Sequence, residues 1–153
     1  MKPFDIFFRL SRKSNILNHF FSFVYHCDIP QKLKMGDGVK FIHKGLGVVI
    51  TEGATIGNNV CIQHHVLIGE KNGTDYPIIE DDVIINPYCL ILGKVRIGKG
   101  SVIGAGSIVT KSTPPNCLYY NKVTPVYKNL TEDEKKRITK YILEKKNIQR
   151  GYK

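Results

Sequence analysis

The sequence predicts an all-β solenoid, in which very short strands wind around one axis in stacked coils. Three observations predict it. An aliphatic residue recurs every six positions, a small or β-branched residue follows four positions after most of these anchors, and glycine often comes directly after the anchor. A period of six fits neither a helix, which repeats near 3.6, nor a half-buried strand, which repeats at 2, but it is typical of hexapeptide β-helices.

The anchors form two uninterrupted series. They are Ile50, Ile56, Ile62 and Ile68, followed by Ile79, Ile85, Ile91, Ile97, Ile103 and Val109. The small or β-branched residues that follow are Ala54, Val60, Val66, Val83, Cys89, Val95, Ser101 and Ser107. We expect the anchors to point into the coil and the smaller residues to fill its corners, with stability coming from contacts between neighbouring coils.

The period breaks at two places. Ile50 lies nine positions after Phe41, and Ile79 lies eleven positions after Ile68, and neither spacing is a multiple of six. The segments 43–47 and 70–77 are therefore predicted to project as loops from the wall of the solenoid, which the short strands form. Insertions on one face of a solenoid often form its binding site.

The N-terminal segment, residues 1–27, differs in composition from the repeat. It holds seven aromatic residues interspersed with Arg9, Arg12 and Lys13. This composition favours a packed helix or a subunit contact, and a membrane interface is the alternative. The basic residues interrupt any apolar stretch, so no secretory signal is expected.

The C-terminal segment, residues 128–153, follows a β-helix domain predicted over residues 28–127. Thr131 and Glu134 form a capping box, which predicts an α-helix over residues 131–149. We favour a cap over the open end of the solenoid, and an anion-binding arm is the alternative.

The net charge of +10 lies mainly in these two end segments, which carry +3 and +5. A basic chain suits an anionic partner, but a nucleic acid is not expected because no aromatic platform or groove-reading motif accompanies the charge. No apolar run approaches the roughly 20 residues of a membrane-spanning helix. The four cysteines show no metal-ligand spacing, which predicts reduced thiols and a cytoplasmic location.

His43 is the first candidate for chemistry, because it begins the first loop and its imidazole suits a general base near neutral pH. Asp28 lies 15 residues earlier, about one coil, where it would be a stacked neighbour able to orient the imidazole. His64 and His65 are adjacent, so on a strand they would point to opposite faces. His64 is then a candidate for lining a substrate cleft.

The segment Ile103-Gly-Ala-Gly-Ser-Ile-Val-Thr-Lys111, followed by a Pro-Pro-Asn turn at 114–116, resembles the hexapeptide-repeat acyltransferases. The order Asp28-Ile-Pro, Lys34-Met-Gly-Asp-Gly, Phe41-Ile-His43 and Asp75-Tyr-Pro resembles their serine acetyltransferase branch. Within that branch the chain is most similar to short colanic acid and capsular polysaccharide O-acetyltransferases. The resemblance covers about residues 26–128 and implies a left-handed parallel β-helix, a homotrimer, and acetyl-CoA as co-substrate without a metal.

The resemblance also implies roles for individual residues. His43 would be the general base and Asp28 its orienting partner, while a backbone N–H near Gly69 would hold the oxyanion. Positions matching contacts to acetyl-CoA are Gly69, Pro87, Ala105, Thr110, Lys111 and Lys128. Tyr76 and His64 are the candidates for binding the acceptor.

The acceptor is predicted from two differences. Serine acetyltransferases have an acidic residue before the catalytic histidine and an Arg-His-Pro in the loop, where this chain has Ile42 and Asp75-Tyr76-Pro77. These changes remove charged groups suited to a zwitterion, so we expect a saccharide hydroxyl of a surface-polysaccharide precursor, handled in the cytoplasm or at the inner face of the membrane. Serine is the alternative acceptor. A metal enzyme resembling γ-class carbonic anhydrase, which needs three converging histidines, and a non-catalytic scaffold are further alternatives.

Overall fold

The computed structural model describes residues 3–122, 129–137 and 139–140. The chain divides into two compact units, Met1–Asn121 and Lys122–Lys153. The first unit contains two helices and a β-helix, and the candidate site residues considered below lie in it, with the exception of Lys128.

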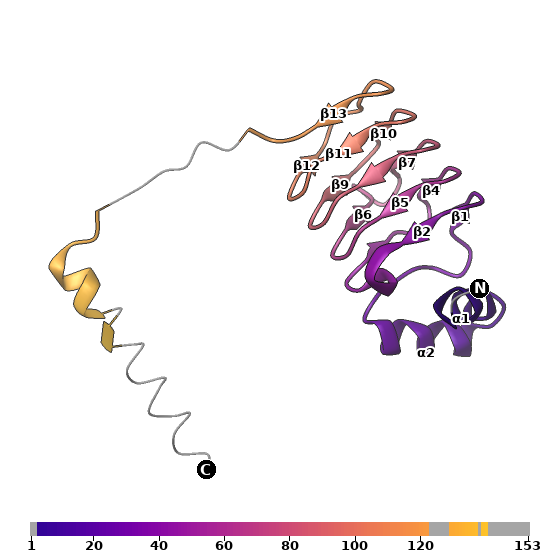
Figure 1. The fold of residues 1–153 in the computed structure, drawn as a ribbon, viewed down its shortest axis with the longest axis horizontal. Coiled ribbons are helices and arrows are strands. Elements are labelled where there is room, and N and C mark those ends of the chain that lie inside the picture. The colour runs from indigo at the N-terminus through magenta and orange to yellow at the C-terminus, as the bar shows by residue number, and fades with distance from the viewer. Residues whose placement is uncertain (1–2, 123–128, 138, 141–153) are drawn as a thin grey trace, which may run out of the picture. The chain divides into compact units, whose positions relative to one another are not determined.

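Within the described residues, thirteen strands of two or three residues form three parallel sheets (Figure 1). The first sheet has the order β1 (Lys34–Met35), β4 (Thr55–Ile56), β7 (Ile78–Ile79), β10 (Arg96–Ile97). The second has the order β13 (Leu118–Tyr119), β11 (Val102–Ile103), β8 (Ile84–Ile85), β5 (Cys61–Ile62), β2 (Lys40–Phe41). The third has the order β12 (Ile108–Val109), β9 (Leu90–Leu92), β6 (Leu67–Gly69), β3 (Val49–Ile50). Strands that follow one another along the chain lie in different sheets, and this is the predicted solenoid.

The hexapeptide anchors stack in columns at the centre of the solenoid. Ile62, Ile85 and Ile103 pair in register on neighbouring strands of the second sheet, and all three are fully buried. Each such side chain stabilises the fold by about 1.5–3 kcal/mol. The predicted corner residues are buried as well, and they are Ala54, Val60, Val66, Val83, Cys89, Val95, Ser101 and Ser107. The period-six interpretation is therefore confirmed.

Both predicted breaks are insertions that leave the stacking intact. Residues Ile42–Gly45 form a short 3₁₀ helix, η1, and yet Phe41, just before it, pairs in register with Ile62 one coil further on. In the second loop, Lys71 and Asp75 form an isolated antiparallel bridge, and the first sheet continues beyond it in register. The extra residues therefore leave the wall without displacing it.

Two N-terminal helices, α1 (Pro3–Ser11) and α2 (Asn15–Tyr25), pack against the first coil. Phe8 contacts Phe21 of α2 and Phe41 of β2, at ring-centroid distances of 5.4 and 5.3 Å. The Arg12 guanidinium donates a hydrogen bond to the Leu33 carbonyl at 2.7 Å. These contacts confirm that the segment is a packed helical element. Its outer face nevertheless remains apolar, and Phe23 is 75% exposed there.

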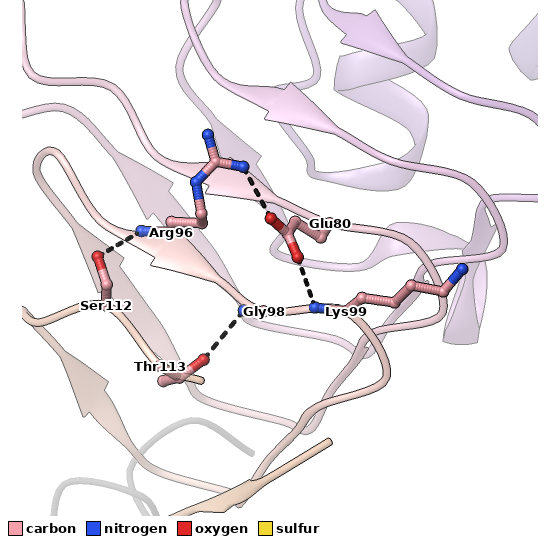
Figure 2. Close-up of polar contacts among 6 residues, drawn as sticks. All are labelled: Glu80, Arg96, Gly98, Lys99, Ser112 and Thr113. Atoms are coloured by element: carbon pink, nitrogen blue, oxygen red, sulfur yellow. Dashed lines mark hydrogen bonds and ion pairs between the residues drawn. The ribbon is translucent and has the colours of Figure 1, made fainter. Parts of the chain in front are cut away.

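The last strand of the first sheet, β10, is covered by residues 112 and 113, through a backbone bridge between Ile97 and Thr113 and through the side-chain hydrogen bonds that Figure 2 shows. The backbone N–H of Arg96 donates to Ser112 Oγ at 3.0 Å, and that of Gly98 donates to Thr113 Oγ1 at 3.1 Å. On the second sheet β13 pairs with β11, and on the third the Ile108 N–H donates to Asn121 Oδ1 at 2.5 Å. Residues 112–121 thus satisfy backbone groups at the C-terminal end of all three sheets.

The second unit contains the predicted capping box. The Thr131 N–H donates to the Glu134 carboxylate at 2.8 Å, and the Glu134 N–H donates to Thr131 Oγ1 at 3.3 Å. Residues 132–137 and 139–140 are helical. The remainder of the predicted helix, residue 138 and residues 141–149, lies outside the described residues, and the cap role stays a prediction.

Candidate functional site

One corner of the solenoid, between the second and third sheets, collects four of the predicted site residues in successive coils. His43, His64, Pro87 and Ala105 all lie in the turns that make this corner. A ladder of backbone hydrogen bonds holds the turns together. The N–H of His65 donates to Leu46 O at 2.8 Å, that of Tyr88 to His64 O at 3.3 Å, and that of Gly106 to Pro87 O at 2.9 Å.

The loop that carries His43 has a strained backbone. His43 and Lys44 both have left-handed conformations, with φ of 53° and 60°, which cost non-glycine residues about 1–2 kcal/mol each. Gly47 is required nearby, because its φ is 67° and a Cβ there would come within 2.1 Å of His65 Nδ1. Such strain is typical of functional loops held by their surroundings.

The His43 imidazole is exposed and lies edge-to-face against His64, with ring centroids 5.0 Å apart and an interplanar angle of 83°. His64 and His65 belong to a turn rather than a strand, so the prediction that they point to opposite faces is wrong. Their centroids are 5.5 Å apart. His65 in turn stacks on Tyr88 at 5.0 Å and 15°.

Tyr88 is a residue of the candidate site that sequence reasoning missed. A signal for it exists, because Gly47, His65, Tyr88 and Gly106 each lie three positions before an anchor of the third sheet, and all four have positive φ. A bulky residue at this position of a coil is therefore displayed at the corner that carries His43.

Asp28 lies one coil before the His43 loop, bridged to Val49. Its N–H donates to Val48 O at 2.8 Å, and its carbonyl accepts from the Ile50 N–H at 2.9 Å. The carboxylate is exposed. Asp28 and His43 both lie within residues 3–122, which the structure describes, and no hydrogen bond joins their side chains. The topology thus brings the predicted pair into neighbouring coils without a direct contact between the side chains.

A different corner, between the third and first sheets, holds the other predicted residues. Gly69 closes β6, Tyr76 belongs to the loop 70–77, and Thr110 and Lys111 follow β12 as exposed residues. The Tyr76 hydroxyl donates to Gly73 O at 2.7 Å, and its ring covers Gly53, where a Cβ would come within 2.4 Å of it. One chain therefore divides the predicted site between two corners. Lys128 lies outside the described residues.

The Cys27 thiol, next to Asp28, is poorly suited to act as a nucleophile. Burial, and then the Asp28 carboxylate, raise the pKa of the Cys27 thiol to about 11, which disfavours the nucleophilic thiolate. Across the described ranges, no group of three or more His, Cys, Asp or Glu side chains is arranged to hold a metal ion. The same part of the chain contains no helix long and apolar enough to cross a membrane.

Comparison with known proteins first gives the class of the repeat. Residues 76–111 match the family model of bacterial transferase hexapeptides, described as six repeats. The β-helix also matches those of solved acetyltransferases, which confirms the predicted left-handed parallel fold. The resemblance to hexapeptide-repeat acyltransferases is thus supported.

The particular relatives are serine acetyltransferases. One from Buchnera aphidicola is 36% identical over 126 residues, covering 75% of this chain and 48% of the relative. Serine acetyltransferase 2 of Arabidopsis thaliana is 31% identical over 136 residues, covering 85% and 42%. These comparisons do not support the expected similarity to colanic acid and capsular polysaccharide enzymes.

Two similar structures are the serine complexes of the Neisseria gonorrhoeae and soybean serine acetyltransferases. They have TM-scores of 0.63 and 0.65, identities of 39% and 38%, and cover 67% and 69% of this chain. The chain covers 42% and 44% of those chains. It therefore spans less than half the length of these relatives.

Proposed function

We propose that the protein is an acetyl-CoA-dependent O-acetyltransferase. The observation that carries this proposal is His43, displayed on a strained corner loop of a β-helix whose sequence and fold are similar to those of serine acetyltransferases. A projecting imidazole on a rigid scaffold is suited to a general base.

In the proposed reaction, the His43 imidazole takes the proton of the acceptor hydroxyl. The oxygen attacks the thioester carbonyl of acetyl-CoA, the carbon–sulfur bond breaks, and the thiol of coenzyme A leaves with a proton returned by His43. Asp28, in the neighbouring coil, would orient the imidazole and stabilise its cation when the proton is transferred. A backbone N–H near Gly69 stabilises the oxyanion of the tetrahedral intermediate.

The divided site supports an oligomer, which we propose to be a homotrimer. His43 lies at one corner, while Gly69, Tyr76, Thr110 and Lys111 lie at another. A neighbouring copy that presents its second corner to the first would assemble a whole site between subunits. Such an arrangement would use the same two corners at each of three interfaces.

The first corner also suits acetyl-CoA. Gly106 has a φ of 69° and open space where a Cβ would stand, so a ligand can approach the backbone beside Ala105 closely. At the second corner, Lys111 is exposed and able to pair with the phosphate groups. Lys128 is assigned the same role from its position in the sequence alone.

Serine is the acceptor that the comparisons favour, because the relatives are serine acetyltransferases and two similar structures hold serine. A saccharide hydroxyl is the second candidate. Ile42, beside His43, is uncharged, and the Tyr76 hydroxyl is already engaged by Gly73 O. Neither side chain supplies a charge to the ammonium or carboxylate of an amino acid.

An acceptor screen tests both. Release of the coenzyme A thiol from acetyl-CoA is followed with serine, with nucleotide sugars and with oligosaccharides, using the wild type and His43→Ala. Turnover with serine that the substitution abolishes supports the first candidate, and turnover with sugars alone supports the second. Absence of transfer to every acceptor would overturn the acetyltransferase proposal.

The outer face of the N-terminal helices supports a separate proposal, contact with an anionic membrane. Ile16, Phe20 and Phe23 are exposed at helical spacing on α2, and exposed Lys13 lies close by in sequence. Apolar insertion beside basic residues suits an anionic lipid surface. Co-sedimentation with vesicles containing phosphatidylserine should fall sharply for Phe23→Ser relative to the wild type. Equal binding of the wild type and Phe23→Ser to the vesicles would refute the contact.

A further inference from the structure

The side chain of His43 has little to hold it in one orientation apart from a neighbouring ring. It is exposed, its backbone belongs to a left-handed turn, and the structure gives it no hydrogen-bond partner among the described residues. A histidine in this situation can occupy several χ1 rotamers. Its edge-to-face contact with His64 is therefore the restraint that favours one of them.

His64 is itself held firmly. Its ring lies edge-to-face against His65 and against Tyr88, with both centroids 5.5 Å away and interplanar angles of 75° and 80°. Its Nδ1 is enclosed and has no hydrogen-bond partner. A ring packed on several sides by aromatic groups presents a fixed surface to its remaining neighbour.

The support extends to the next coil. His65 and Tyr88 stack nearly parallel, and the backbone of each is tied to the preceding coil, through Leu46 O and His64 O. The three rings of His64, His65 and Tyr88 therefore form an aromatic cluster anchored to the solenoid. His43, by contrast, is carried on an inserted loop.

We infer that His64 is a positioning residue, whose ring fixes the orientation of the His43 imidazole toward the acceptor hydroxyl. This inference rests on the proposed function, in which His43 is the general base, and it assigns His64 an action through His43. Small misplacements of a catalytic group cost large factors in rate, so loss of this contact should lower kcat about 10- to 100-fold.

The test compares His64→Ala with His64→Phe, which keeps an aromatic ring but has no nitrogen. His19→Ala is the matched control, because that exposed histidine bonds only to Asn15 O of its own helix. With the acceptor that the screen identifies, we expect His64→Ala to lower kcat with little change in either KM, and His64→Phe to recover most of the loss. A raised acceptor KM in both variants would overturn the inference, because it would indicate direct binding of the acceptor by His64.

A second measurement separates failure of this inference from failure of the proposed function. The ring protons of His43, assigned by comparison with His43→Ala, are followed by NMR in the absence of substrates. A ring held edge-to-face should give a shifted signal in the wild type and in His64→Phe, and an averaged signal in His64→Ala. If the His43 signal is the same in all three, the inference fails whether or not acetyl transfer is observed.

Discussion

The Glu80 carboxylate accepts a hydrogen bond at 2.7 Å from the Arg96 guanidinium, which lies one coil further along the first sheet (Figure 2). Its second oxygen accepts the backbone N–H of Lys99, also at 2.7 Å. These two hydrogen bonds, that to Arg96 first, lower the pKa of Glu80. Glu80 thus joins two neighbouring coils on the outside of the solenoid.

The lowered pKa predicts a pH-dependent stability. Since the folded pKa lies below the unfolded value of about 4.3, the stabilisation is present above that value and is lost as the pH falls through the folded pKa. Glu80→Gln should lower the thermal midpoint at pH 7, and the difference from the wild type should shrink below about pH 4. Glu52→Gln, at an exposed turn, is the control. An equal difference at pH 7 and at pH 3 would contradict the prediction.

Thr113 provides a second test at the same end of the first sheet. Thr113→Val removes the acceptor of the Gly98 N–H in a buried position, so unfolding in urea should require about 1–3 kcal/mol less free energy. Thr113→Ser keeps the hydroxyl and should retain most of the stability. If Thr113→Val and Thr113→Ser have the same free energy of unfolding, the hydrogen bond does not contribute to stability.

Truncation of a side chain on one face of α2 should destabilise the protein strongly, and truncation on the other face should have little effect. Phe21 is 1% exposed and packs on Phe8, so Phe21→Ala should cost about 3–5 kcal/mol in the free energy of unfolding. Phe23→Ala, on the exposed face, should stay within about 0.5 kcal/mol of the wild type. A large loss for Phe23→Ala in the isolated protein would mean that a second copy covers this face.

The proposed general base gives the most direct test of the chemistry. His43→Ala should lower kcat about 10²- to 10⁴-fold, while the binding of acetyl-CoA, measured by calorimetry, and the thermal midpoint should change little. Retention of the wild-type rate would exclude His43 as the base. His19→Ala again serves as the control.

Asp28→Asn tests the proposed orienting role. The substitution keeps the size of the side chain but removes its charge, so the imidazolium of His43 loses a stabilising partner, and we expect kcat to fall about 10- to 100-fold, less than in a buried triad. The KM for acetyl-CoA should be unchanged. An unchanged kcat would show that the carboxylate does not act on His43 during turnover.

The repeat could be predicted from the sequence because period six has one structural solution, and the positions of both inserted loops followed from where the period fails. The site could be predicted only in part. His43 and Asp28 were found from loop position and coil length, but the contact between His43 and His64 depends on the left-handed backbone at His65, which turns adjacent residues out of strand geometry. The division of the site between two corners also depends on three-dimensional wrapping that spacing alone does not reveal.

The unbroken pairing on either side of the two loops has an evolutionary consequence. Phe41 pairs with Ile62, and Ile56 pairs with Ile79, although residues have been inserted between the two members of each pair. Changes in the length or composition of these loops therefore need not disturb the packing of the stacked coils. Acceptor preference can thus diverge among proteins that share this scaffold while their coils stay the same, so a loop exchanged with a relative should carry its specificity with it.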